Sequence, residues 1–243
     1  PQKRGFWMKL EKRLLPKIKY AYTVSAPIAA FYNEKYYMDI KVIRNLPFRL
    51  EKAPVVEKFP GNTAVIIYQG ALNIGRGLEY IIRAMQYLEH ARLLIAGDGE
   101  ITADLQELTG NMNLSEKVIF KGRLPFDELS RITPAADIGL SIEENLGLNY
   151  YYALPNKLFD YIQAGVPVMV SDFPEMKKIV ESYDIGITIN NHDPEYIAGR
   201  IKEMLSDKDR YAEWKINLKK AAQDLCWENE KEKLISLIKS VQH

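Results

Sequence analysis

The sequence has few of the residues that build disulfides or zinc sites. Cys226 is the only cysteine among 243 residues, so no internal disulfide can form and nothing points to an oxidising compartment. The three histidines, His90, His192 and His243, lie far apart, and no Cys/His cluster has the spacing of zinc ligands. We therefore expect no metal site.

Long apolar runs and an excess of one charge are also missing. No apolar run is long enough to span a bilayer. Lysine and arginine together number 33, against 32 aspartates and glutamates, and this balance argues against a nucleic-acid partner. The chain shows no signal peptide and begins at Pro1 without a methionine, so we expect it to be a piece of a longer protein.

What the sequence does have is an alternation of short apolar runs and amphipathic helical segments from about Val65 onward. Apolar strands without polar alternation are usually covered on both faces of a sheet. The expected strands are Val65–Gln69, Arg92–Ala96, Val118–Lys121, Ile138–Ile142, Pro167–Ser171 and Ile185–Ile189. This alternation predicts an α/β fold, a Rossmann-like doubly wound parallel sheet.

The two ends of the chain follow other patterns. The elements expected there are the helices Phe6–Leu15, Ala29–Tyr37, Asp209–Leu225 and Asn229–Val241 and the strands Tyr22–Ser25 and Ile40–Ile43. The head is too short for an α/β domain of its own and has the pattern of the last βαβ unit of one. We therefore divide the chain into residues 1–45, a linker over 46–62 with the polar stretch Glu51–Asn62, a sheet domain over 63–226, and a C-terminal helix over 227–243.

Glycine-rich turns follow the first three expected strands of the sheet, where ligands of parallel sheets bind. Gly70 to Gly77 lets backbone amides approach a phosphate and carries Arg76, but Gly77 stands where a P-loop needs Ser or Thr, so a P-loop is rejected. Gly97 and Gly99 form a Gly-x-Gly turn, and Gly122-Arg123-Leu124 follows the third strand. Each turn by itself is also compatible with an ordinary connection.

The fourth turn is the most informative. Ser141–Leu154 is a long polar and aromatic loop that contains Glu143, Glu144, Asn149 and Tyr150. Pro155 then starts a helix whose first turns bring Asn156, Lys157 and Asp160. Lys157 offers a cation to a phosphate, and the Asp160 carboxylate can accept two hydrogen bonds from the vicinal hydroxyls of a ribose. Helix capping is the alternative role for Asn156 and Asp160.

In this order the motifs resemble those of the C-terminal domain of family 4 type retaining glycosyltransferases of the GT-B fold. The phrase Pro155-Asn156-Lys157-Leu158-Phe159-Asp160-Tyr161 resembles a Pro-Asn-Lys variant of capsule and O-antigen glycosyltransferases, and Gly165-Val166-Pro167-Val168 matches the end of the family's Glu-x7-Glu segment. The match covers about Val65 to Leu205. The head resembles the end of the family's N-terminal acceptor domain, and the tail from Trp227 resembles a final helix that returns to that domain.

This resemblance implies one GT-B half-domain, which binds a UDP-, GDP- or ADP-sugar, plus the end of the other half. The full protein would transfer a hexosyl-type sugar to a glycan or lipid-linked acceptor with retention, without an obligatory metal or cofactor. The implied catalytic residues are Glu144 and Lys157, and the implied donor-binding residues are Gly70, Arg76, Gly97, Gly99, Arg123, Leu124, Asn149, Tyr150, Asn156 and Asp160. We expect the chain itself to bind nucleotide without catalysing transfer.

The chain departs from the family pattern at the charged positions. Ala71 replaces the loop arginine, Arg76 replaces the loop lysine, and Asp160 stands for the second glutamate. Counting back to the first glutamate reaches Tyr152, which is not acidic, and Glu143 or Glu144 could take its place only through a different loop path. Two other functions therefore stay open: a nucleotide-sugar epimerase of the same fold, and a non-catalytic nucleotide-binding or scaffold subunit.

The predicted location is the cytoplasm. The basic and aromatic segment Lys3–Tyr20 has two interpretations: a helix of the absent domain with its charged face in water, which we favour, or a peripheral contact with the inner membrane.

Overall fold

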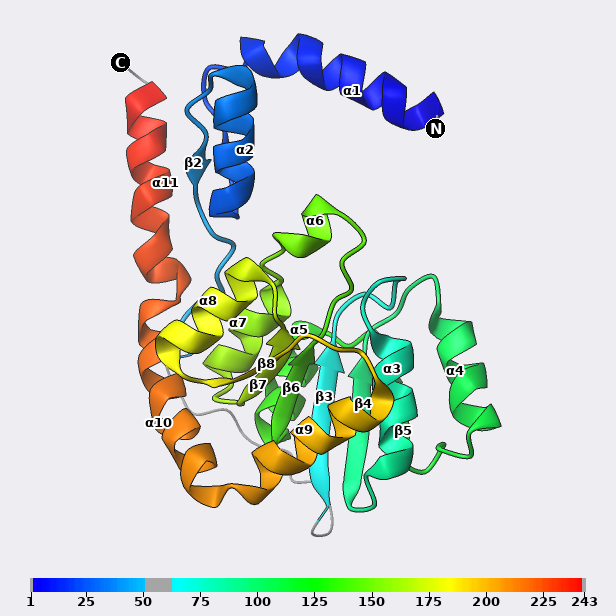
Figure 1. Ribbon diagram of the computed structural model, residues 1–243. Coiled ribbons are helices and arrows are strands. Elements are labelled where there is room, and N and C mark those ends of the chain that lie inside the picture. The colour runs from blue at the N-terminus through cyan, green and yellow to red at the C-terminus, as the bar shows by residue number, and fades with distance from the viewer. Residues whose placement is uncertain (1, 51–62, 242–243) are drawn as a thin grey trace. The chain divides into compact units, whose positions relative to one another are not determined.

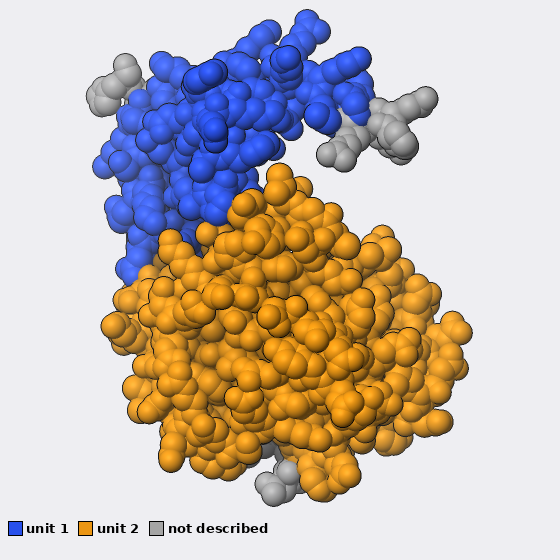
Figure 2. Space-filling view, viewed as in Figure 1, with its two compact units in different colours: residues 1–46, 227–243 blue, residues 47–226 orange. Residues whose placement is uncertain are grey.

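The computed structural model describes residues 2–50 and 63–241, and the linker stretch 51–62 lies outside the described residues. The chain divides into two compact units, one formed by residues 47–226 and the other by residues 1–46 together with 227–243 (Figure 2). Their assignment to the donor and acceptor halves of an enzyme stays a prediction.

The larger unit is built on a six-stranded parallel sheet in the order β5-β4-β3-β6-β7-β8. Its strands are β3 (Ala64–Gln69), β4 (Ala91–Ala96), β5 (Val118–Gly122), β6 (Ile138–Ser141), β7 (Val168–Ser171) and β8 (Gly186–Ile189). Every strand lies within one residue of its expected ends. The predicted Rossmann-like α/β fold is confirmed.

Helices cover both faces of this sheet (Figure 1). The helices of the larger unit are α3 (Leu78–Ala84), α4 (Thr102–Asn111), α5 (Phe126–Ile132), α6 (Leu148–Tyr151), α7 (Asn156–Gln163), α8 (Pro174–Tyr183), α9 (Pro194–Ser206) and α10 (Lys208–Asp224), with 3-10 turns at Met85–Tyr87 and Thr133–Ala135. The one-turn helix α6 stands inside the stretch 141–154, for which the sequence predicts only a loop. A single turn buries too little to leave a periodic apolar pattern.

The two faces of the sheet have different packing. On one face, Ile66 of β3 belongs to a core with Leu105 of α4 and Ile201 of α9. On the other, the fully buried ring of Tyr161 from α7 lies directly over Gly139 of β6, where an added Cβ would come within 2.5 Å of the ring. Glycine is needed at this position because the helix approaches the strand so closely.

The strand order reverses between β3 and β6. The chain proceeds outward from β3 to β4 and β5 and then crosses back to β6, so the loops after β3 and β6 diverge at the carboxyl edge of the sheet. In doubly wound sheets this divergence opens the crevice in which ligands bind.

The smaller unit contains a short parallel βαβ motif. The elements of this unit are α1 (Gln2–Leu14), a 3-10 turn (Leu15–Lys17), β1 (Tyr22–Thr23), α2 (Ala26–Tyr36), β2 (Lys41–Val42) and α11 (Trp227–Val241), and the motif is formed by β1, α2 and β2. The buried Glu230 of α11 accepts a hydrogen bond of 2.8 Å from the amide of Arg44, which ties the C-terminal helix to the end of β2. Helix α2 starts before the expected Ala29, because Pro27 fits the first turn of a helix.

Within the described ranges, no helix combines the length and the apolar composition that crossing a bilayer requires.

Candidate functional site

An open cleft of about 460 Å³ lies at the carboxyl edge of β3, β4 and β5. Its lining includes five of the residues expected at a donor site: Gly70, Gly97, Gly99, Arg123 and Leu124. A volume of this size is in the usual range for pockets that bind small ligands.

Glycines allow two of the loops around the cleft to pack backbone against backbone. A Cβ added to Gly97 would lie 1.8 Å from the carbonyl oxygen of Gly70, and one added to Gly99 would lie 2.3 Å from that of Leu72. The Leu72 amide donates to the Asp98 carbonyl at 3.1 Å, which fastens the two loops together. One wall of the cleft therefore consists of peptide groups rather than side chains.

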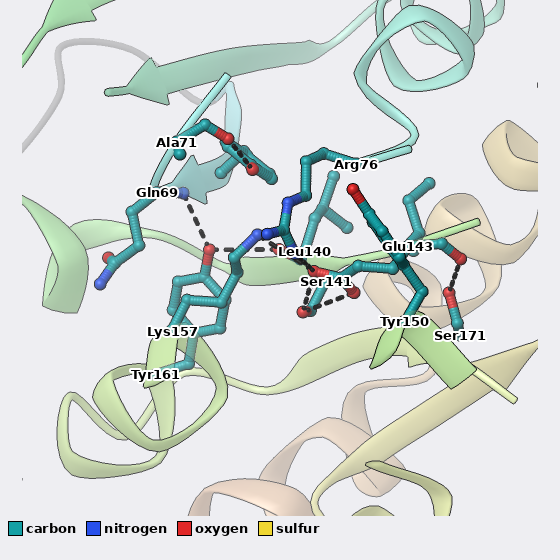
Figure 3. A network of polar contacts seen from close by, with 12 residues as sticks. Gln69, Ala71, Arg76, Leu140, Ser141, Glu143, Tyr150, Lys157, Tyr161 and Ser171 are labelled. Carbon is teal, nitrogen blue, oxygen red and sulfur yellow. Dashed lines mark hydrogen bonds and ion pairs between the residues drawn. The ribbon is translucent and has the colours of Figure 1, made fainter. Parts of the chain in front are cut away.

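Two cations converge on one buried carboxylate beside this wall. Arg76, from the loop after β3, and Lys157, from the start of α7, both point toward Glu143, which follows β6 (Figure 3). Glu143 Oε1 lies 3.2 Å from Lys157 Nζ and 3.7 Å from Arg76 Nη1, and the carboxylate is fully buried. Ser141 Oγ donates to the same carboxylate at about 3.0 Å. Arg76, Lys157 and Glu143 together have a formal net charge of +1.

Lys157 is held in place by more than its ion pair. Its ammonium lies 3.9 Å from the centre of the Tyr68 ring, a cation–π contact, and only 7% of the residue is exposed. Its Cε stands 3.5 Å from the position of a Cβ on Gly70. The ammonium is thus next to the glycine loop.

The loop after β6 is fastened to the glycine loop by the residues around Tyr150. The Glu144 amide donates to the Gly75 carbonyl at 2.9 Å, and Tyr150 Oη donates to the Ile74 carbonyl at 3.2 Å. The Arg76 guanidinium lies over the Tyr150 ring at 5.4 Å, so the same tyrosine restrains the cation.

Glu144, the expected catalytic carboxylate, has a different neighbour from Glu143. Its Oε2 accepts a hydrogen bond of 3.4 Å from Tyr80 Oη, and the negative charge of Glu144 raises the pKa of Tyr80. In the described part of the chain, it is Glu143 and not Glu144 that contacts Lys157 and Arg76.

Asp160 lies one turn further along α7 and points toward β3. Its Oδ2 accepts a hydrogen bond of 2.9 Å from Gln69 Nε2. Burial raises the pKa of Asp160, and the hydrogen bond from Gln69 partly offsets that rise. The start of α7 at Pro155 has no side-chain cap hydrogen bond, so the structure gives no support to a capping role for Asn156.

The structure thus brings most of the expected residues to one edge of the sheet. Arg76, Tyr150 and Lys157 form one group, and Asn149 and Asn156 are exposed on α6 and at the start of α7. The sequence offers Glu143 only as an alternative to Glu144, and it gives Gln69 no role. The available signal was a polar residue at or just after the end of a buried apolar strand.

In the portions of the chain that the structure describes, no group of three or more His, Cys, Asp or Glu side chains is placed to hold a metal ion.

Comparison with known proteins gives a family match over most of the chain. Residues 51–221 match the model of the family described as glycosyl transferases group 1. An uncharacterised glycosyltransferase of Methanocaldococcus jannaschii is 30% identical over 59% of this chain and 36% of its own length. The alpha-monoglucosyldiacylglycerol synthase of Streptococcus pneumoniae is also 30% identical, over 48% of this chain and 25% of its own length. The chain therefore spans about a quarter to a third of the length of these relatives.

Solved structures show the same fold. HepE of Anabaena, solved in complex with UDP and glucose, superimposes with a TM-score of 0.78 at 16% sequence identity, covering 96% of this chain and 65% of that one. This likeness identifies the fold as that of GT-B glycosyltransferases.

Proposed function

The chain belongs to the group 1 glycosyltransferases, and from that premise we propose that it is the donor-binding part of an enzyme that transfers a sugar from a nucleotide diphosphate sugar to a glycan or a lipid-linked acceptor. The observation that carries the proposal is the convergence of Arg76 and Lys157 beside the glycine loop.

In this proposal the diphosphate lies between the glycine loop and the two cations. Arg76 and Lys157 neutralise it, and the amides at the start of α7 add the positive end of a helix dipole. As the sugar leaves, negative charge grows on the departing nucleotide, and fixed positive groups stabilise that charge without having to reorganise. Glu143 keeps both cations oriented while the site is empty.

The nucleoside would occupy the cleft beside Arg123 and Leu124, with Asp160 as the acceptor for the ribose hydroxyls. HepE, a structural neighbour, was solved with UDP and glucose, which makes UDP the first nucleotide to test. The diacylglycerol in the name of the pneumococcal relative makes a lipid acceptor the first acceptor to test. Retention of the anomeric configuration is proposed from the sequence resemblance.

The test begins with thermal unfolding in the presence of UDP, GDP, ADP, CMP and their sugar conjugates. A ligand that binds only the folded state stabilises it by about 2.7 kcal/mol at a hundred times its Kd. We expect one nucleoside diphosphate to raise the melting temperature and Lys157→Ala to abolish that rise. Stabilisation by none of them, in this chain and in the full protein, would overturn the proposal.

Turnover separates the alternatives. We expect this chain to bind the nucleotide without transferring sugar, and the full protein to yield a glycosylated acceptor whose anomeric configuration NMR would assign. Isomerisation of the donor's sugar without its transfer would instead identify a nucleotide-sugar epimerase, an alternative that the family match does not favour. Nucleotide binding by a full protein that neither transfers nor isomerises sugar would identify a non-catalytic subunit.

A further inference from the structure

Gln69 is a buried polar residue that the proposed chemistry leaves without a role. It is the last residue of β3 and immediately precedes Gly70, and only 2% of it is exposed. A buried amide must satisfy its hydrogen-bonding groups, because an unpaired one costs about 1–3 kcal/mol. Its partners therefore indicate what it does.

Both ends of the Gln69 amide are occupied. Nε2 donates to Asp160 Oδ2 at 2.9 Å, and Oε1 accepts from Thr133 Oγ1 at 2.9 Å, which shares its single proton with the Leu129 carbonyl at 2.8 Å. An ionised carboxylate can only accept, so the nitrogen end of the amide must face Asp160 and the oxygen end must face the hydroxyl. The Gln69 backbone amide donates in turn to Tyr161 Oη at 3.1 Å (Figure 3). Gln69 is thus fixed between α7 and the turn that contains Thr133.

This fixed amide restrains only one oxygen of Asp160. Among the residues that the structure describes, no hydrogen bond reaches the other oxygen, Oδ1. Asp160 and Gln69 also line a small pocket with apolar walls that include Phe48, Phe126 and Leu129. A carboxylate in such surroundings would turn toward water unless a donor held it, because burial disfavours its charge.

We propose that Gln69 is a positioning residue that holds the Asp160 carboxylate for the vicinal hydroxyls of a ribose, and that this pair makes the site select ribonucleotides over 2′-deoxyribonucleotides. The inference rests on the proposed donor site. Asp160 is one methylene shorter than a glutamate, so its reach depends on a fixed starting position. Thr133 acts one step further away, by fixing the orientation of the Gln69 amide.

The experiment measures the affinities of UDP, GDP and ADP and of their 2′-deoxy forms for this chain by calorimetry. For a nucleotide that binds, we expect the wild type to prefer the ribose form by roughly ten- to a hundredfold, the range of a hydrogen bond to a charged group. Gln69→Leu should reduce that preference to less than about threefold while the affinity for the deoxy form changes little. A merely structural role for Gln69 would weaken both forms equally.

Three further variants complete the test. Gln163→Leu is the matched control: Gln163 lines the same pocket, but its Nε2 donates to the carbonyls of Ala222 and Leu225, so the preference should be kept. Asp160→Asn should lose the preference for the ribose form. The double variant with Gln69→Leu and Asp160→Asn should lose no more of it than Asp160→Asn alone, because both substitutions remove the same interaction. If Gln69→Leu does not fold, Thr133→Val provides the readout, with an expected intermediate preference.

Each failure has a separate meaning. Binding of none of the six nucleotides overturns the donor site, and the inference with it. Equal binding of ribose and deoxyribose forms by the wild type leaves the diphosphate site standing but overturns the ribose role. If Gln69→Leu folds and keeps the preference for the ribose form, the role of Gln69 alone is overturned. If Gln69→Leu does not fold, a folded Thr133→Val variant that keeps the preference overturns that role.

Discussion

Glu143 shows how a single residue links the stability of this fold to its chemistry. A carboxylate with no exposed surface needs a partner, because desolvation of a charge costs several kcal/mol. Lys157 at 3.2 Å supplies that partner, and it is also one of the two cations proposed to face the diphosphate. Loss of Lys157 should therefore have two separable effects.

The first prediction concerns Lys157→Met. The variant leaves Glu143 without its nearest cation, and we expect the free energy of unfolding to fall by about 3 kcal/mol, the lower end of the range for a broken buried pair. We expect the loss of unfolding free energy to stay at the lower end because Arg76 still lies 3.7 Å from the Glu143 carboxylate. Urea denaturation measures the change.

The double variant Glu143→Gln with Lys157→Met is its control. Removing the stranded carboxylate should restore most of the lost stability, while nucleotide binding stays weak because the cation is still missing. If binding returned together with stability, Lys157 would have only a structural role.

The second prediction concerns Asp160→Asn and its dependence on pH. Burial raises the pKa of Asp160, so the native state holds the proton more tightly than the unfolded chain does. Asp160 therefore favours folding below its unfolded pKa, and this contribution is lost as the pH rises through its folded pKa. We expect Asp160→Asn to melt above the wild type at neutral pH, with a difference that shrinks in acid. Scanning calorimetry across the pH range measures this, and a difference that grows in acid would contradict it.

The sequence predicts the individual site residues unevenly. Arg76, Lys157 and Asp160 stand out because a charge follows a glycine turn or opens a helix. Glu143 does not, because its importance depends on burial and on a partner fourteen positions away that only the fold brings within 3.2 Å. Counting back along the family's glutamate spacing leads to Tyr152 instead, since the loop after β6 takes its own path and contains α6.

At the scale of elements, the strands could be predicted more closely than the helix ends. Buried parallel strands are uninterrupted apolar runs, and their limits are set by burial, which the sequence displays directly. Helix ends depend on local conformations that many residues can adopt, so α2 and α11 extend beyond their expected ranges. The conformation of the loops at the cleft depends on a third factor, because it requires glycine where two loops pack backbone against backbone.

The third prediction compares two glycines. Gly97→Ala places a methyl group 1.8 Å from the Gly70 carbonyl, at a φ of 159°. We expect a loss of about 2–5 kcal/mol from overpacking and backbone strain, together with weaker nucleotide binding, because the loop after β4 must move away from the glycine loop. Chemical denaturation and calorimetry measure the two effects.

Gly199→Ala is the matched control for this change. Gly199 lies in α9 with no atom within 4 Å of its added Cβ, and alanine should stabilise the helix by about 1 kcal/mol without affecting binding. Tolerance of alanine at both positions would show that the two loops are not packed as described.

At the scale of the whole molecule, the division into two units predicts how the chain unfolds. The unit of residues 47–226 contains the entire proposed donor site and a continuous core. Residues 47–226 produced alone should therefore fold cooperatively, and should bind the same nucleoside diphosphate as the whole chain. Calorimetric scans of both proteins, with and without nucleotide, would measure this. A truncated protein that folds but does not bind would place part of the site outside residues 47–226.

The smaller unit is built from two segments that are far apart in the sequence, and this has a consequence for folding during synthesis on the ribosome. Of its two segments, residues 1–46 are made before the uninterrupted stretch 47–226, and residues 227–243 are made after it. Glu230 can reach the amide of Arg44 only after α11 has left the exit tunnel. During translation the sheet domain can therefore fold before α11 packs against residues 1–46.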